Sequence, residues 1–480
     1  MHFSIPDTQE FIDASGNAYV GYNIHINGLF HCTVRYKQLH NLHEQLTRDL
    51  DISLPPFPPK KFFPLTVNQQ EERRISLEKY IQSIGQHIVV NNSGMLNGFL
   101  LNAQQESIGG PSNMENLDIF LTNGCTISVN VSTGDNPAEV LKKIYKHLRL
   151  PEQYYSYFAL FIVIQDEDNC VYLLRKLQEF ESPFITYKNM RTIGSRLVIM
   201  KNYWDIDYDL ELMKDPVALN LLYIQAISEI ERGWILVPEE LKDRLSSLRD
   251  SEKRREYLDI ARTLKYYGYI QFAPCFCDYP QAESKVLVAI GGNELNVRIF
   301  SNEEQHEAAF KVSRMRCWRI TTLQNGSDRC EESNEFTLEL SFEYLIARNQ
   351  LQWITIASEQ AILMSVCLQS MIDELLLKSV GGSRNKEVTA KSWTYIMRDG
   401  QSRIIMGAPN EQTDDNKINC NDQPTKSEPI MKKLAGKLAA VKIKKPEEPR
   451  TPVRRISINQ TSDYDTMENN AFQMIGDDDL

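Results

Sequence analysis

Residues 54–64, LPPFPPKKFFP, constrain the fold of this chain more than any other stretch. Five of these eleven residues are proline, which fixes φ and lacks a backbone N–H. The stretch is therefore neither a helix interior nor a central strand, and we expect an extended loop near polyproline II. A stiff exposed loop with apolar and cationic side chains suits the anionic surface of a membrane. The residues that we expect to touch a membrane are Phe57, Lys61, Phe62 and Phe63.

Residues 1–108 indicate one α+β module built around this loop. Apolar and polar residues alternate along residues 18–36, and Asn27-Gly28 is a strong signal for a two-residue hairpin. A helix with leucines on one face precedes the loop, and a second helix with an apolar face follows it. The loop therefore connects two helices that pack on a small sheet.

Cations and one tyrosine cluster in the sequence around these elements: Arg35, Tyr36, Lys37, Lys60 and Arg73. An arginine fork binds a phosphate through two parallel hydrogen bonds, and a lysine adds a point charge. Each cation taken alone is better explained as a solvated surface charge. The net charge of the chain is −11, so general attraction to nucleic acid is not expected, and anion binding would depend on such locally grouped cations.

The middle of this 480-residue chain changes its pattern twice, which predicts three lobes. Two strands, a helix and two further strands are typical of a ubiquitin-like fold. A helical stretch follows, and then about seven strands with a closing amphipathic helix indicate a phosphotyrosine-binding-type (PTB-like) barrel. Such a barrel leaves a groove between an edge strand and the helix, where an extended peptide can add as a further strand. We expect the lobes at 115–206, 207–269 and 270–380.

The composition shifts after residue 380 to Asn, Asp, Lys, Glu, Pro and Ser, which predicts a disordered tail over residues 381–480. The nine cysteines are spread singly and the eight histidines show no ligand spacing, so we expect no disulfide framework, metal or cofactor. No run approaches the roughly 18 apolar residues of a membrane span. No nucleophile elbow or phosphate-binding glycine loop is present, so an enzyme is not expected. We expect a cytoplasmic protein with peripheral membrane contact.

The first module resembles the phox-homology (PX) domain. That family has R-Y at a strand end, a proline-rich loop with a lysine, and an arginine thirteen residues after that lysine, as this chain does. The resemblance implies a pocket for phosphatidylinositol 3-phosphate. It implies that Arg35 holds the 3-phosphate and that Tyr36 stacks beneath the inositol ring. Lys37 and Lys60 would neutralise phosphate, and Arg73 would bond ring hydroxyls.

The order of ubiquitin-like, helical and PTB-like lobes is that of a FERM module with F1, F2 and F3 lobes. PX followed by FERM is the layout of a small subfamily of sorting nexins, which the words MRCWRIT, ERGWILV and LQSMIDEL resemble. The resemblance implies an α+β multidomain fold and binding of Asn-Pro-x-Tyr (NPxY) or Asn-x-x-Tyr tails of integrin-type and lipoprotein-receptor-type receptors. By position it assigns the groove to Trp318, Leu345, Ile372 and Leu376, with Leu345 on the candidate edge strand. Without the family, each of these residues would be interpreted as barrel core.

Two words near the C-terminus extend this resemblance. The last six residues are similar to the C-terminus of a subfamily member, which implies binding of the Retriever recycling complex: Ile475, Gly476, Asp477, Asp478, Asp479 and Leu480. Asn469 and Phe472 form an Asn-x-x-Phe word close to the cargo motif. We therefore hypothesise that the tail occupies the groove of its own barrel and autoinhibits it.

The resulting prediction is an endosomal cargo adaptor on the cytoplasmic face of early and recycling endosomes. It would return receptors to the cell surface and prevent their lysosomal degradation. One alternative is a Ras-type small GTPase effector, or a signalling scaffold at endosomes, that uses the ubiquitin-like lobe. A basic edge on that lobe would favour a GTPase partner, but residues 116–131 carry none. A cytoskeletal linker would require an actin-binding tail, which the sequence does not indicate.

Overall fold

We describe a computed structural model of the chain. The described residues are 2–12, 16–61, 64–87, 89–90, 93–110, 112–165, 171–190, 194–300, 305–324, 336–348, 350–379, 393–405, 466–469 and 472. Phe62, Phe63 and the last six residues lie outside them, so the predictions for those positions are not addressed by the structure.

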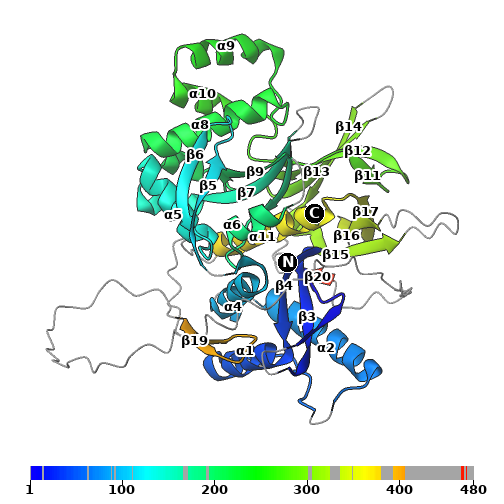
Figure 1. The fold of residues 1–480 in the computed structure, drawn as a ribbon. Coiled ribbons are helices and arrows are strands. Elements are labelled where there is room, and N and C mark those ends of the chain that lie inside the picture. The colour runs from blue at the N-terminus through cyan, green and yellow to red at the C-terminus, as the bar shows by residue number, and fades with distance from the viewer. Residues whose placement is uncertain are drawn as a thin grey trace, which may run out of the picture. The chain divides into compact units, whose positions relative to one another are not determined.

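The first lobe is an antiparallel sheet packed against helices (Figure 1). Strand β3 is central, with β1 and β2 paired along one side and β4 along the other. Asn27 and Gly28 join β3 to β4 with φ of 53° and 78°, the left-handed region that a two-residue hairpin loop requires. The elements are β1 Phe3–Ser4, β2 Thr8–Ile12, β3 Ala18–Ile26, β4 Leu29–Arg35, α1 Tyr36–Asp49, α2 Val67–Gln86, α4 Met95–Gln104 and a π-helical turn Gln105–Gly109.

The second lobe has the ubiquitin-like architecture expected from its sequence. Its sheet has the order β6-β5-β9-β7-β8, and β5 runs parallel to β9. Helix α5 starts with a capping box between Asn136 and Glu139 and buries Val140 and Ile144 against the sheet. The central strand β9 was not predicted from the sequence. The elements are β5 Met114–Phe120, β6 Thr126–Ser132, α5 Pro137–Leu148, a 3-10 helix Glu152–Tyr157, β7 Phe158–Gln165, β8 Val171–Lys176, α6 Pro183–Asn189 and β9 Ser195–Lys201.

The third lobe is helical and shares one hydrophobic core with the second. Asp215 accepts the N–H groups of Val217 and Ala218 at 2.9 Å each, which caps the start of α8. Leu221, Leu222 and other α8 residues face the same core as the F1 sheet. The helices are α7 Tyr208–Leu212, α8 Pro216–Glu231, α9 Glu239–Asp250 and α10 Arg254–Ala261.

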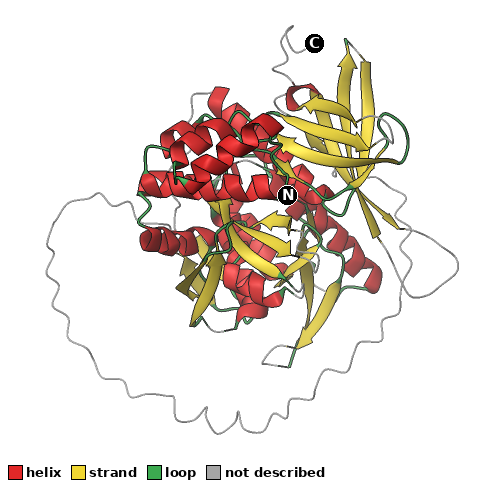
Figure 2. Cartoon of the chain, turned by 90° about the horizontal axis from the view of Figure 1, so that it is seen from above, coloured by secondary structure: helices red, strands yellow, loops and turns green. Residues whose placement is uncertain are grey.

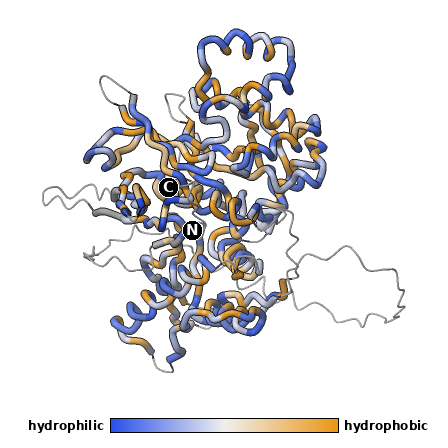
Figure 3. Tube along the Cα trace, turned by 180° about the vertical axis from the view of Figure 1, so that it is seen from behind, coloured by the Kyte–Doolittle hydropathy of each residue, from blue (hydrophilic) through white to orange (hydrophobic). Residues whose placement is uncertain are grey.

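The fourth lobe is a strand-rich barrel closed by helix α11, and its strands form one yellow group in Figure 2. The strand order is β14-β13-β12-β11-β17-β16-β15-β20. Apolar side chains of the strands and of α11 meet in one buried core. Hydrophilic and hydrophobic residues are interspersed along the chain (Figure 3). The elements are β10 Ile270–Gln271, β11 Cys275–Cys277, β12 Ser284–Gly291, β13 Glu294–Phe300, β14 Gln305–Lys311, a 3-10 turn Val312–Arg314, β15 Met315–Gln324, β16 Phe336–Ala347, β17 Gln350–Ala357 and α11 Ala361–Ser379. The predicted α+β fold class, PX followed by a three-lobed FERM module, is confirmed.

Two segments beyond residue 380 are folded, which corrects the prediction of a continuous disordered tail over 381–480. β18 Trp393–Ile396 and β19 Ser402–Ile405 form a hairpin, and β20 Thr466–Glu468 adds to the barrel sheet. Both segments are held by other parts of the chain, because strands of three or four residues are not stable by themselves. No helix in the described part of the chain is both long and apolar enough to cross a membrane.

The PX lobe and the F1 lobe meet at a buried histidine. The ring of His31 is 5% exposed, stands edge-on to Phe180 and lies with Nε2 3.1 Å from the carbonyl oxygen of Leu100. Burial lowers the pKa of His31 to about 4, although the Glu181 carboxylate acts in the opposite direction. The imidazole is therefore neutral in the folded protein at neutral pH.

We expect this histidine to make the fold less stable in acid. Between pH 6.5 and 4 the unfolded chain binds a proton at His31 that the folded chain does not, so the free energy of unfolding falls as the pH is lowered. The full effect is about 3 kcal/mol, as an order of magnitude. Urea unfolding of His31→Gln against pH should show a flatter profile than wild type. The same change at exposed His147 should keep the wild-type slope, and parallel profiles for His31→Gln and wild type would contradict this account.

Candidate lipid pocket and peptide groove

Three of the predicted lipid-binding residues, Arg35, Tyr36 and Arg73, come from β4, α1 and α2. The proline loop contacts Tyr36 and Arg73. Arg35 ends β4 and Tyr36 begins α1. The hydroxyl of Tyr36 donates to the carbonyl oxygen of Pro58 at 2.8 Å. The guanidinium of Arg73, from α2, lies 4.4 Å above the Tyr36 ring and donates to the Pro59 carbonyl at 3.4 Å. Residues from positions 35 to 73 thus contribute to one candidate site.

In the described part of the chain, the cations of this site are not paired with carboxylates. Arg35, Lys37, Lys60 and Arg73 form no ion pair with Asp or Glu among the residues that the structure describes, whereas the neighbouring Arg74 contacts Glu71 and Glu78. Lys37 and Lys60 are exposed. Burial raises the pKa of the Tyr36 phenol and Arg73 opposes that rise, so the phenol stays protonated and can donate. The arrangement offers unneutralised positive charge beside a ring face, which suits a phosphorylated polyol.

The proline loop is held in place at Phe57. This ring is half-buried and stacks on His43 at 4.9 Å with an interplanar angle of 15°, and it meets Tyr80 edge-on at 4.9 Å. The ring of Phe57 thus anchors the loop to α1 and α2, and its contact with a membrane stays a prediction. Lys61 is exposed on the loop, as expected for a membrane-facing cation.

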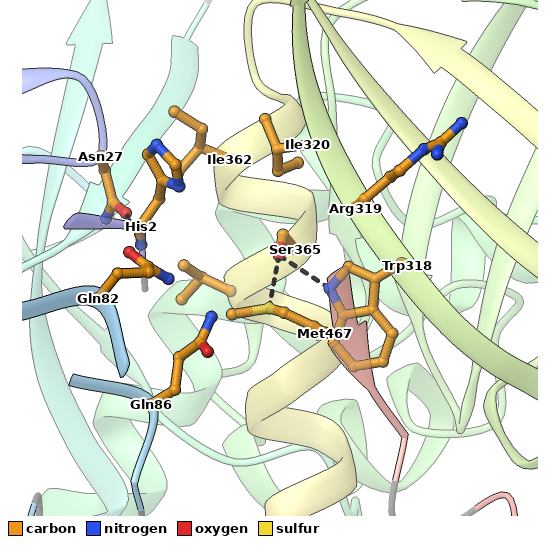
Figure 4. Close-up of a pocket in the computed structure, with 11 residues that line it drawn as sticks. His2, Asn27, Gln82, Gln86, Trp318, Arg319, Ile320, Ile362, Ser365 and Met467 are labelled. Carbon is orange, nitrogen blue, oxygen red and sulfur yellow. Dashed lines mark hydrogen bonds between the residues drawn. The ribbon is translucent and has the colours of Figure 1, made fainter. Parts of the chain in front are cut away.

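The peptide groove lies beside β15, and a segment of the tail occupies it (Figure 4). β20 pairs antiparallel with β15, with Met467 opposite Trp318. Trp318 is fully buried, and its Nε1 donates to Ser365 Oγ of α11 at 2.9 Å. The Ser365 hydroxyl in turn donates to the sulfur of Met467 at 3.5 Å. The tail strand is thus fixed between the edge of the sheet and the closing helix.

The chain turns directly after this strand. Asn469 is 4% exposed, and its Nδ2 donates to the carbonyl oxygens of Val312 at 2.9 Å and Met315 at 2.6 Å. Its backbone N–H donates to the Arg316 carbonyl at 3.1 Å. The N–H of Phe472 donates to the Asn469 carbonyl at 3.0 Å, which closes a turn. A strand followed by a turn whose first residue is a buried Asn is the conformation observed for the Asn-x-x-Phe word.

Three of the four predicted groove residues do not line the pocket that Met467 enters. Leu345 is on β16, which runs between β15 and β17, so the expectation that it lies on the edge strand is wrong. Ile372 is 1% exposed and belongs to the barrel core, and Leu376 packs against that core. Trp318 alone of the four lines the occupied pocket. The sequence could not order the strands, and strand order decides which of them is the edge.

The far wall of this pocket comes from the PX lobe. Gln82 and Gln86 at the end of α2, with His2 and Asn27, line it opposite Trp318 (Figure 4). No local pattern in the sequence links α2 to the barrel, so this wall was not predictable from the sequence. Helix α2 also carries Arg73, so one rigid element reaches both sites.

A PX lobe with a cationic pocket, joined to a three-lobed FERM module with a peptide groove, defines a trafficking adaptor of the PX–FERM class. The family models agree in the same order along the chain: PX domain at 22–103, sorting nexin 17/27/31 FERM F1 lobe at 115–204, sorting nexin 17/31 FERM F2 lobe at 205–265 and Sorting Nexin 17 FERM C-terminal domain at 268–376.

Curated relatives match over the whole chain. Sorting nexin-17 of Danio rerio is 42% identical and that of Homo sapiens 41% identical, each over 100% of both chains. Sorting nexin-31 of Homo sapiens is 33% identical over 84% of this chain and 93% of its own length. The chain therefore belongs to the sorting nexin 17 family, of which sorting nexin 31 is a paralogue, and it is an endosomal sorting adaptor.

Proposed function

We propose that this adaptor binds phosphatidylinositol 3-phosphate through the PX pocket and NPxY or Asn-x-x-Tyr tails of transmembrane receptors through the F3 groove. It delivers these receptors to the Retriever complex through its C-terminus, so that they return to the cell surface. Receptors of the integrin and lipoprotein-receptor type are the expected cargo. The protein acts on the cytoplasmic face of early and recycling endosomes.

Arg35, Tyr36 and Arg73 support the lipid half of this proposal. Arg35 ends β4, and the guanidinium of Arg73 lies over the ring of the next residue, Tyr36, so both arginines can offer charge-assisted donors to a phosphorylated ligand. The exposed lysines Lys37, Lys60 and Lys61 add attraction to an anionic leaflet, at about 1 kcal/mol each.

The observation that most strongly supports the proposed cargo binding is the buried position of Asn469. Its buried amide donates to two backbone carbonyls that belong to the barrel and are available to any peptide with Asn at this position. A strand on β15 supplies sequence-independent hydrogen bonds, and the amide supplies selection for Asn. An NPxY tail has the same chemistry, so it fits as a replacement for residues 466–472.

Cargo and tail then compete for one groove. The tail is attached to the barrel, so its local concentration is set by the linker and opposes weak external ligands. A receptor tail would displace it and free the C-terminal Leu480 for Retriever. We propose that this competition makes the protein engage Retriever mainly when it carries cargo.

Asn469→Ala in the full-length chain should strengthen binding of an NPxY peptide. The change removes two buried hydrogen bonds, each worth about 0.5–1.5 kcal/mol, from the closed state alone. We expect the dissociation constant measured by calorimetry to fall by about tenfold. Phe472→Ala should act in the same direction.

Asn470→Ala is the matched control, because it makes the same chemical change at a position that the Asn-x-x-Phe word leaves free. Its affinity should equal that of wild type. If the Asn469 variant also binds the peptide with wild-type affinity, competition by the tail is refuted. If neither wild type nor the variant binds the peptide at all, the cargo assignment itself fails.

A further inference from the structure

The hairpin that follows the FERM module packs into the core of the PX lobe, beside α1 (Figure 1). Trp393 is 6% exposed and Tyr395 is 2% exposed, and both belong to the PX hydrophobic core. The indole lies over Gly98 of α4, where a Cβ would stand 2.5 Å from Cζ2 of Trp393. Only glycine leaves room for the ring at this position, so α4 provides a fitted notch for the hairpin.

Amide side chains on one face of α1 hold the backbone of β18. Gln45 accepts from the N–H of Thr394 and donates to its carbonyl, both at 2.7 Å. Asn41 donates to the same carbonyl at 3.1 Å, and Gln38 donates to the carbonyl of Ile396 at 2.9 Å. These amides satisfy the strand as a neighbouring strand would, so the hairpin is a bound element of the PX lobe.

The turn of the hairpin is fixed by Glu106. The Tyr395 hydroxyl donates to Oε2 of Glu106 at 2.8 Å, and the Arg398 N–H donates to Oε1 at 2.6 Å. The Arg398 guanidinium donates to the backbone carbonyl of Glu106 at 2.6 Å. The carbonyl of Arg398 then accepts from Nη1 of Arg35 at 2.7 Å, although the two residues are 363 positions apart.

Arg35 is consequently held on two sides. Its guanidinium carbon lies 3.7 Å above the ring of Tyr19, and one of its five N–H groups is bound by the hairpin. Among the described residues, the other four N–H groups have no hydrogen-bond partner, so they are available to a ligand. The turn also reaches Lys37, whose Nζ lies 3.9 Å from where a Cβ on Gly400 would stand.

We propose that the hairpin, residues 393–405, is a positioning element of the phosphoinositide pocket, so that this PX lobe is complete only with a segment from beyond the FERM module. The inference rests on the proposed lipid function and adds to it the means by which Arg35 is oriented. The guanidinium of Arg398 is ion-paired with the Glu106 carboxylate at 3.9 Å, so its charge is already matched and the turn contributes an acceptor for Arg35. A side chain ordered before the ligand arrives loses less freedom on binding, and affinity rises accordingly.

Release of the hairpin in the full-length chain tests this inference. Gly98→Ala adds a Cβ that displaces Trp393 while favouring the helix of α4, and Trp393→Ala removes the anchor from the hairpin side. Both variants should bind the soluble headgroup inositol 1,3-bisphosphate about tenfold more weakly than wild type in calorimetry. Because the two changes disturb the fold in different ways, a loss that they share is attributable to the hairpin. Their affinity for an NPxY peptide should stay unchanged.

Ile404→Ala is the matched control, since this side chain belongs to the same hairpin and is 69% exposed. It should bind the headgroup as wild type does. A double-mutant cycle separates positioning of Arg35 from general damage: in an Arg35→Lys background, Trp393→Ala should have little further effect. An undiminished loss in that background would overturn the positioning role.

The remaining outcomes are distinguishable. Wild-type headgroup affinity in both release variants overturns the inference while leaving the lipid function intact. Tighter binding in both variants also overturns it, because the hairpin would then cover the pocket. Absence of binding by wild type itself refutes the lipid function and not the packing of the hairpin.

Discussion

Arg35→Ala should reduce binding to liposomes carrying phosphatidylinositol 3-phosphate by about a hundredfold or more. The residue supplies a charge-assisted fork, worth roughly 1.5–3 kcal/mol for each hydrogen bond to a charged group. The loss is large because the Tyr19 ring and the Arg398 carbonyl already orient the guanidinium. The side chain therefore loses little conformational entropy when the lipid binds. Flotation of the full-length protein with vesicles of stated composition measures it.

Lys61→Ala is the control for charge alone. Lys61 is exposed on the loop. The Lys61→Ala change removes the same unit of positive charge as Arg35→Ala, so it should weaken vesicle binding only about fivefold, and by less at high salt. The NPxY peptide should bind both variants as it binds wild type. Flotation of Arg35→Ala at the wild-type level would show that the assigned pocket is not the lipid site.

Deletion of Leu480 should abolish capture of purified Retriever. The chain ends in three aspartates and a leucine, so the deletion removes an apolar side chain worth about 1.5–3 kcal/mol and moves the terminal carboxylate by one residue. Recognition of a C-terminal carboxylate depends on its position. The lost leucine side chain and the shifted carboxylate should therefore both weaken binding. A pull-down with full-length and shortened chains, in the presence of saturating NPxY peptide, measures the effect.

Two comparisons make this result specific. The shortened chain should retain lipid flotation and peptide affinity, and the Arg35→Ala protein should still capture Retriever. Asn469→Ala, which frees the tail, should raise capture without peptide toward the level seen with peptide. Undiminished capture after loss of Leu480 would place the Retriever contact elsewhere in the chain.

The candidate sites were only partly predictable. The candidate lipid residues were predicted from the PX-type pattern of R-Y, proline loop and distant arginine, and the structure places Arg73 over the ring of Tyr36, the residue that follows Arg35. The groove residues were assigned by family position and depended on which strand is the edge. That assignment failed for Leu345 because β16 is an interior strand, and for Ile372 because its side of α11 faces the core.

The sequence by itself determined the local features of this protein. Asn27-Gly28 specifies its hairpin because few residues adopt positive φ. The prolines of residues 54–64 exclude helix and strand. The spacing of apolar residues, at a period of 3.6 or 2, indicates which stretches are helical and which are strands. These signals act over a few residues, so they can be read without the fold.

The tertiary structure alone decided what distant segments do for one another. Phe57 became an anchor because α1 and α2 present His43 and Tyr80 to it, and residues 393–405 are ordered because α1 and α4 supply amides and a notch. The hairpin residue Thr394 and its partner Gln45 are 349 positions apart, so no local sequence pattern links them. The physical reason is that a short hairpin is marginally stable alone, so it is ordered only when another element satisfies its backbone and covers its apolar side chains.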